Sequence, residues 1–250
     1  MTTTRSTVGP TLFRTLILSC LLCVLNTPMK GADQKEVIYN CHDLSGWRKP
    51  TGTWEPVRSV AIDHAVPEQF IVTSGVGALL NSPTNHSVDL VTDGDFGDVE
   101  VHIEFAIARH SNSGVYLMGR YEVQIFDSYG VAKDKYPGIE CGGIYPRWID
   151  GKEFEGHSPL VNASKPAGAW QSFDITFKAP RFDANGKKIS NAQFVKVLLN
   201  GKVVQEKVEV NGPTRGAVAE DERASAPLRL QGDHGPVAFR NIRIKPVALD

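Results

Sequence analysis

The sequence lacks the marks of several common classes of protein. Its 27 Lys and Arg residues nearly balance 28 Asp and Glu residues, and no cluster of basic residues stands out. A protein that neutralises several phosphates normally shows such a cluster, so we expect no nucleic-acid partner. The motifs GxSxG, GxxxxGK[ST] and HExxH do not occur, which leaves a serine hydrolase, an NTPase and a zincin unsupported.

Cysteine is also scarce. The chain has four, of which Cys20 and Cys23 lie in an N-terminal apolar run. Outside that run, no CxxC motif or His/Cys spacing indicates a structural zinc site. The other two, Cys41 and Cys141, could pair in an oxidising compartment or remain free thiols, and both alternatives stay open.

The N-terminal apolar run covers residues 16–25 and follows the basic residues Arg5 and Arg14. A transmembrane helix needs roughly 20 apolar residues, so the run is too short to span a bilayer, but it fits a secretory signal. Small residues, Gly31 and Ala32, follow it. The pattern predicts a signal peptide over residues 1–31, export to the periplasm or beyond, and no membrane span in the mature chain. An uncleaved anchor is the alternative. Lipoprotein processing is disfavoured, because residues 17–19 before Cys20 fit its signal poorly.

Helical periodicity is almost absent; residues 148–154 could form one short helix at most. Alternation of apolar and polar residues is common instead, and it is clearest over residues 98–108, where Glu100, His102 and Glu104 separate apolar side chains. Similar stretches are residues 70–73, 87–91, 115–126, 172–177, 194–199, 203–210, 228–230 and 236–244.

These stretches are separated by turn residues, and Asn200-Gly201 between two apolar runs is a strong hairpin signal. Many antiparallel strands with short turns predict an all-β fold, an antiparallel β-sandwich or jelly roll, with one domain over residues 36–247. The positions expected to be buried are Val99, Val101, Ile103, Phe105, Ile107, Val123, Ile125, Phe173, Ile175 and Phe177.

Residues 120–127 form the most informative segment for function. On a strand, Glu122 and Gln124 share one face, and a bulge at residues 125–126 would bring Asp127 to the same face. The segment is similar to the E-x-D-x-x-E strand of laminarinase-type glucanases, although Gln124 replaces the middle acid. Retaining glycoside hydrolysis needs two carboxylates close together, so the replacement of the middle acid weakens the hypothesis of a retaining glycosidase. The alternative is that Glu122 and Gln124 have no role in function and simply lie on a strand face exposed to solvent.

Two loops add candidate residues. Residues 109–114 include Arg109 and Asn112 and could line a sugar pocket or form an ordinary turn. Residues 231–235 contain Gln231 and His234, and a break in alternation at residues 240–241 predicts a bulge that re-aims Arg240. Four aromatic residues could stack on a sugar ring or belong to the core: Tyr116, Tyr129, Tyr145 and Trp148.

Four segments together resemble the 3-keto-disaccharide hydrolase family, also described as 3-keto-glucoside lyase/hydratases, over about residues 37–245. They are Asp43-Leu-Ser-Gly-Trp47, Asn112-Ser-Gly-Val-Tyr116, Gly119-Arg-Tyr-Glu-Val-Gln-Ile-Phe-Asp-Ser-Tyr-Gly130 and Leu230-Gln-Gly-Asp-His-Gly-Pro-Val-Ala-Phe-Arg-Asn-Ile242.

The resemblance implies a concanavalin-like jelly roll and an exported enzyme that acts on glycosides already oxidised at C3. Such chemistry needs a base, an acid and a group that stabilises an enolate. We assign Glu122 and His234 as the acid/base pair, with Arg240 or a divalent cation at the enolate. The residues expected to bind substrate are Arg109, Asn112, Tyr116, Gln124, Asp127 and Gln231. The expected partners are a 3-keto sugar and an upstream sugar 3-oxidoreductase.

Two other functions stay open at this point. Lectins share the jelly roll, so the chain could be a non-catalytic carbohydrate-binding module. It could also be a laminarinase-like glucan hydrolase.

Overall fold

Alternating side chains produce strands throughout the described part of the chain. The computed structural model describes residues 1–2, 35–132 and 138–250, and it contains no helix among them. The predicted signal peptide therefore falls outside the described residues except for its first two. The strands are β1 (Val37–Tyr39), β2 (Glu55–Ile62), β3 (Phe70–Leu80), β4 (Leu90–Phe96), β5 (Val99–Ile107), β6 (Asn112–Leu117), β7 (Tyr121–Phe126), β8 (Arg147–Ile149), β9 (Lys152–Phe154), β10 (Gln171–Lys178), β11 (Arg181–Phe182), β12 (Lys188–Ser190), β13 (Ala192–Leu199), β14 (Lys202–Val210), β15 (Ala226–Leu230) and β16 (Val237–Pro246).

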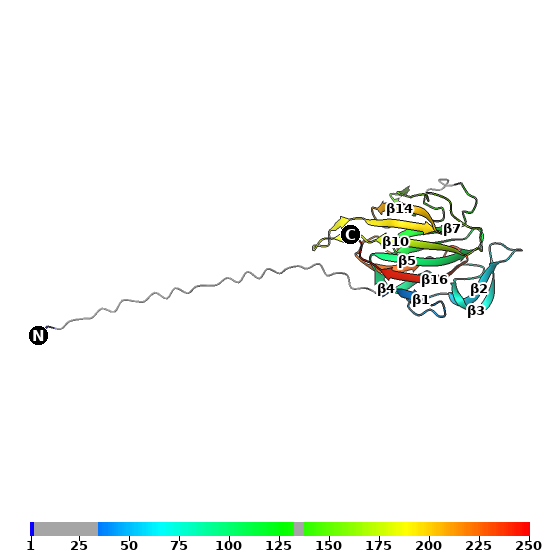
Figure 1. The fold of residues 1–250 in the computed structure, drawn as a ribbon, viewed down its shortest axis with the longest axis horizontal. Helices are drawn as coiled ribbons and strands as arrows, with labels where there is room; N and C mark the ends of the chain where they lie inside the picture. Colours follow the sequence, from blue (N-terminus) through cyan, green and yellow to red (C-terminus); the bar gives the residue numbers. More distant parts are fainter. Residues whose placement is uncertain (3–34, 133–137) are drawn as a thin grey trace. The chain divides into compact units, whose positions relative to one another are not determined.

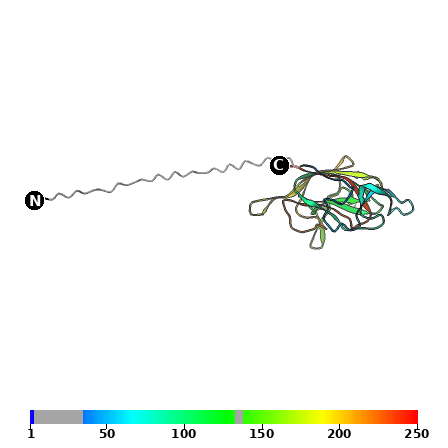
Figure 2. The ribbon, with the colours of Figure 1, turned by 90° about the horizontal axis from the view of Figure 1, so that it is seen from below.

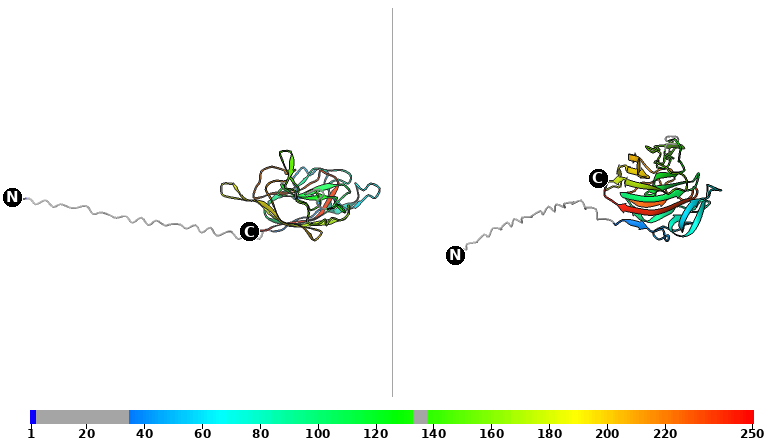
Figure 3. Two further views of the ribbon diagram at one scale, coloured as in Figure 1. Left: turned by 90° about the horizontal axis from the view of Figure 1, so that it is seen from above. Right: turned by 45° about the vertical axis from the view of Figure 1, so that its right-hand side comes forward.

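Two antiparallel sheets form the sandwich. The larger has the order β14-β13-β10-β5-β16-β3-β2, with β1 paired to β16, and Figure 1 shows β10, β5 and β16 side by side. The smaller has the order β4-β15-β6-β7. Figure 2 and the left view of Figure 3 look at the sheets from their edges, and the right view of Figure 3 shows β16 (red) beside the β2–β3 hairpin (cyan). The fold is the predicted antiparallel jelly-roll type sandwich.

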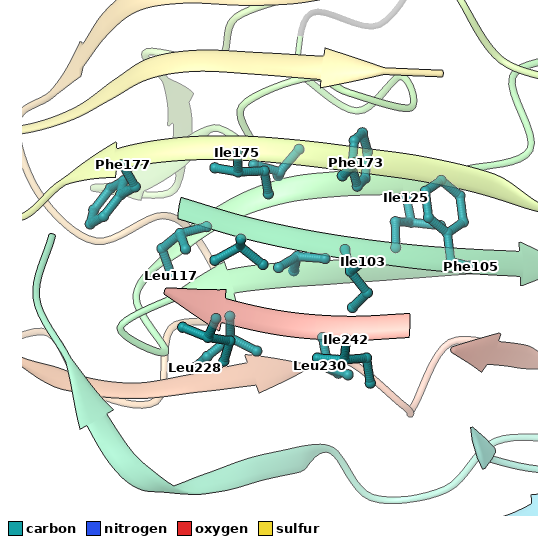
Figure 4. Packing of buried hydrophobic residues seen from close by; sticks show 14 of the residues in the cluster. Ile103, Phe105, Leu117, Ile125, Phe173, Ile175, Phe177, Leu228, Leu230 and Ile242 are labelled. Carbon is teal, nitrogen blue, oxygen red and sulfur yellow. The ribbon is translucent and has the colours of Figure 1, made fainter. Parts of the chain in front are cut away.

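The core lies between the two sheets. All ten positions expected to be buried are 2% exposed or less. Figure 4 shows Ile103, Phe105 and Phe173 from the larger sheet near Ile125 and Leu230 from the smaller one. Full burial of one such side chain stabilises a fold by roughly 1.5–3 kcal/mol. Glu100, His102 and Glu104 are exposed or half-buried on the opposite face, as predicted.

Turns in the structure confirm two sequence signals and correct two. Asn200 and Gly201 have φ angles of 53° and 77° and join β13 to β14, which confirms that hairpin. The ladder between β5 and β16 shifts register between Arg240 and Arg243, which confirms a bulge there. Residues 115–126, predicted as one alternating stretch, form two strands, and residues 148–154 form part of the β8–β9 hairpin rather than a helix. The turn at Asp150-Gly151, with φ angles of 50° and 76°, explains the latter difference.

Both described cysteines, Cys41 and Cys141, are buried free thiols. Among the described residues no helix is long and apolar enough to cross a membrane.

Candidate functional site

A polar cavity of about 390 Å³ opens on the outer face of the smaller sheet. Side chains on β6 and β7 alternate: Val115 and Val123 point into the core, so Tyr116 and Glu122 point away from it. The residues that line the cavity are Asn112, Tyr116, Glu122, Tyr145, Arg215, Gly216, Gln231 and His234. Five of them were candidate site residues from the sequence, and Tyr145 was one of the aromatic residues that could stack on a sugar ring.

The β6–β7 hairpin brings Tyr116 and Glu122 together. Met118 and Gly119, with φ angles of 55° and 63°, form the turn, and the register then places Tyr116 directly opposite Glu122. The Tyr116 hydroxyl donates a hydrogen bond to the Arg215 carbonyl oxygen at 3.3 Å and also interacts with the Glu122 carboxyl group. Residues 115–126 were expected to form one continuous stretch, so neither this turn nor the pairing was predicted.

Glu122 is a buried acid, with 2% of its surface exposed. Burial raises the pKa of its carboxyl group from 4.5 to about 8, against the opposing effects of the Tyr116 hydroxyl and the Arg229 charge. Burial also raises the pKa of Tyr116 far above its ordinary value. The cavity therefore combines a carboxyl group that titrates near neutral pH with a phenol that stays protonated.

Arg229 is the buried cation behind Tyr116. Its guanidinium carbon lies 3.6 Å from the centre of the Tyr116 ring, its Nη1 lies 3.0 Å from Asp89 Oδ2, and its Nη2 donates to the Gly216 carbonyl oxygen at 2.6 Å. The sequence analysis missed this residue. The alternation Leu228-Arg229-Leu230 could have found it, because two core leucines place the arginine on the face that bears Glu122.

Two segments form the walls beside β7. The main chain of residues 142–145 pairs with β7 through Gly142, Gly143 and Tyr145, the last donating to the Glu122 carbonyl oxygen at 3.1 Å. Thr214 accepts a hydrogen bond from the Glu122 amide at 3.2 Å through its Oγ1. No sequence pattern indicated that these segments meet the hairpin.

His234 enters from the loop after β15. The Asn81 side-chain amide donates to the carbonyl oxygens of Gly232 and Gly235, at 2.9 and 2.8 Å, and so fixes the loop. Within it, His234 Nδ1 contacts Asp233 Oδ1, which leaves Nε2 as the ring nitrogen without that contact. A carboxylate partner of this kind orients an imidazole for proton transfer.

Several amide groups at the site are buried without a partner. Both polar atoms of Gln124, and the side-chain carbonyl oxygens of Asn112 and Gln231, have no hydrogen-bond partner among the described residues. Gln124 shares the face of Glu122 and is 1% exposed. Unpaired buried polar groups are costly and rare, so they mark positions that a polar ligand would satisfy.

Four candidate residues lie outside the cavity lining: Gln124, Arg240, Asp127 and Arg109. Arg240 Nε donates to Glu104 Oε2 at 2.7 Å, and its guanidinium stacks 4.0 Å from the Trp170 ring. Both contacts lie on the outer face of the larger sheet, so the expectation that Arg240 joins Glu122 was wrong: the bulge turns it toward Glu104.

Asp127 does not reach the cavity lining either, because β6 and β7 pair regularly to Phe126 and the expected bulge at residues 125–126 is absent. Its Oδ2 accepts a hydrogen bond from the His110 amide at 3.0 Å. Arg109 is exposed on the same turn. Among the described residues, no group of three or more His, Cys, Asp or Glu side chains is arranged to hold a metal ion.

A family model matches residues 34–245, and its description is 3-keto-alpha-glucoside-1,2-lyase-like domain. The chain belongs to this family. The match includes every described residue of the cavity lining and agrees with the resemblance noted in the sequence. No curated protein matches the chain in sequence.

The chain is also similar to proteins of known structure. A protein from Parabacteroides distasonis, described as a "putative glycosyl hydrolase", is 26% identical with a TM-score of 0.59, and the match covers 85% of this chain and 84% of that one. A second protein of the same description and organism is 20% identical with a TM-score of 0.46, covering 78% and 99%. The carbohydrate-binding module CBM66 from Bacillus subtilis is 10% identical with a TM-score of 0.41, covering 79% and 94%. The family supports a carbohydrate-active protein of the glycosidase or lyase kind.

Proposed function

We propose that the protein cleaves the glycosidic bond of 3-keto-glycosides, including 3-keto-disaccharides, by elimination followed by hydration. The observation that carries the proposal is the single buried carboxyl group in a polar cavity: Glu122, with a pKa of about 8, is the one acid among the lining residues. A ketone at C3 acidifies the hydrogen at C2, so one well-placed base is enough to start the reaction.

In the first step Glu122 takes the C2 proton. The electron pair of the C2–H bond forms the C1=C2 double bond through the enolate, and the bond from C1 to the leaving oxygen breaks. His234, another residue of the cavity lining, gives a proton to that oxygen. In the hydration step His234 takes a proton from water, the hydroxyl of that water adds to C1, and Glu122 returns its proton to C2, which gives a 3-keto sugar and restores both residues.

Tyr116 would supply the hydrogen bond that the enolate oxygen needs, with its single hydroxyl proton turning from the Arg215 carbonyl oxygen to the enolate. Its strongly raised pKa keeps the phenol protonated through the cycle, so it donates rather than repels negative charge. Arg229, stacked on the Tyr116 ring, favours negative charge at the same place. The roles that the sequence analysis gave to Arg240 thus pass to Tyr116 and Arg229.

Substrate hydroxyl groups would pair with the amides of Asn112, Gln124 and Gln231. Since the substrate must carry a ketone at C3, an oxidoreductase that oxidises this hydroxyl has to act first. The laminarinase-like alternative is disfavoured, because a retaining glycosidase needs two carboxylates about 5–5.5 Å apart at the scissile bond, and the lining residues offer one.

The test is turnover of a 3-keto-disaccharide by the purified protein, followed as release of free 3-keto monosaccharide. We expect turnover by the wild type and a loss of about 100-fold or more in Glu122→Gln, the scale of removing a general base. Binding of the disaccharide without turnover would favour the lectin-like alternative. Release of reducing sugar from an unoxidised β-glucan would favour the glucanase.

We also propose that the protein is exported and loses residues 1–31. Intact-mass analysis of protein recovered from the periplasm or medium should show a chain that begins near Asp33. Retention of Met1 in that material would contradict this.

A further inference from the structure

The β8–β9 hairpin lies beside one residue of the cavity lining. Arg215 belongs to the lining, and its guanidinium carbon lies 4.2 Å from the centre of the Trp148 ring. The Arg215 amide also donates to the Pro146 carbonyl oxygen at 2.9 Å, which ties the 214–216 segment to the base of the hairpin. Trp148 therefore lies directly beside the cavity.

Trp148 is large, aromatic and 47% exposed. On the two-stranded hairpin it stands opposite Glu153, whereas Phe154 stands opposite Arg147, so Trp148 and Phe154 occupy different faces. Glu153 acts electrostatically on the hydroxyl of Tyr145, another lining residue, which indicates that the Trp148 face is the one turned toward the cavity.

Arg215 has unused hydrogen-bonding capacity. Its guanidinium group has no ion pair or hydrogen bond among the described residues, and its contact there is the Trp148 ring. A guanidinium stacked on an aromatic ring is held in place while its N–H groups still point outward as donors. Hydroxyl-rich ligands fit such a pair, because the C–H face of a sugar ring packs on an aromatic ring while its hydroxyls accept hydrogen bonds.

We propose that Trp148 and Arg215 form a subsite for the leaving group, and that this group is a second sugar ring. The inference rests on the proposed function, since Glu122 and His234 define where the cleaved bond lies. It makes Trp148 a residue that determines specificity: it favours a disaccharide over a glycoside whose aglycone is too small to reach the indole.

The experiment compares two substrates, a 3-keto-disaccharide and methyl 3-keto-glucoside, in four proteins: wild type, Trp148→Ala, Trp148→Phe and Phe154→Ala. Trp148→Ala should lower kcat/KM about tenfold for the disaccharide, the scale of one lost stacking contact, and less than twofold for the methyl glycoside. Trp148→Phe should recover most of the loss. Phe154→Ala removes an equally exposed aromatic from the other face and should match the wild type on both substrates.

An equal loss on both substrates in Trp148→Ala would mean that the tryptophan only supports the hairpin, and no loss on either would remove it from the site; both results overturn the inference. If the wild type turns over neither substrate, the proposed reaction fails separately. The subsite is then tested by calorimetric titration of the unoxidised disaccharide and of methyl glucoside. Weaker binding of the disaccharide alone in Trp148→Ala would support the subsite, and unchanged or undetectable binding would refute it.

Discussion

The carboxyl group of Glu122 lies directly over Gly114 on the neighbouring strand. A Cβ atom at position 114 would be 2.8 Å from the Glu122 carboxyl carbon and closer still to Oε1. Gly114 is not in the left-handed region of φ, so its backbone would accept alanine without strain. Glycine is therefore required at position 114 because the Glu122 carboxyl group occupies the space that a larger side chain would fill.

Gly114→Ala should therefore disable the site while the sheet stays intact. The methyl group would push the Glu122 carboxyl group away from its position, and displacements of about 1 Å can cost about 100-fold in rate. The measurement is kcat/KM on a 3-keto-disaccharide together with the thermal midpoint. Gly94→Ala in β4 is the matched control, because a Cβ there makes ordinary contact with Phe96 at 3.5 Å, and it should leave both unchanged. Wild-type turnover by Gly114→Ala would show that the Glu122 position is not critical.

The sequence predicted the sandwich well because its signal is local. Alternation over β5 and β10 fixes which side chains face the core, and the ten expected core positions are buried. The same alternation correctly placed Glu122 and Gln124 on the face away from the core. The cavity residues Asn112, Tyr116, Gln231 and His234 were found because short motifs carried them.

What failed depended on contacts between distant segments. Arg240 sits at a bulge, as predicted, but alternation gives no direction for a bulged side chain, and Glu104 on β5 determines it. Arg215 reaches the cavity on a loop that contacts Arg120 and Pro146, and no periodic pattern describes loops. Tyr145 was a candidate for stacking on a sugar ring, but its pairing with β7 was not predicted. The alternation along β15 predicts the face on which Arg229 lies. It does not predict the contact with the Tyr116 ring, on which the role of Arg229 depends.

The raised pKa of Glu122 predicts the pH dependence of the reaction. A base must be ionised to accept the C2 proton, so kcat/KM should rise about tenfold per pH unit below the pKa and level off near pH 8. The measurement is a pH profile of kcat/KM from pH 5 to 9. A profile already flat from pH 5 upward would mean that Glu122 is not the base.

The same shift predicts a pH dependence of stability. Because the pKa in the folded protein is raised from 4.5 to about 8, the neutral carboxyl group favours the fold. This contribution is fully present below pH 4.5 and is lost as pH rises through 8, with a span on the order of a few kcal/mol. Glu122→Gln cannot ionise, so its free energy of unfolding should exceed that of the wild type increasingly from pH 5 to 9. A constant difference between the two proteins across that range would contradict the burial of an ionisable Glu122.

Arg240 should matter for stability and not for catalysis. Its pair with Glu104 and its stack on Trp170 lie on the larger sheet and are partly exposed, so Arg240→Ala should cost about 1 kcal/mol in the free energy of unfolding. We expect kcat/KM on a 3-keto-disaccharide to stay within twofold of the wild type. A loss of 100-fold with an unchanged denaturation midpoint would return Arg240 to the site.

Arg229 should act on the reaction through charge. Its guanidinium lowers the pKa of Glu122, so removing the charge in Arg229→Met should raise that pKa and move the rising limb of the kcat/KM profile to higher pH. The substitution also leaves Asp89 without its cation, so some loss of stability accompanies it. Arg229→Lys keeps the charge but cannot hold both Asp89 and the Gly216 carbonyl oxygen with one planar group, and its limb should stay close to the wild-type position even if its stability falls. A limb that moves equally in both variants would assign the effect to packing against Tyr116 rather than to charge.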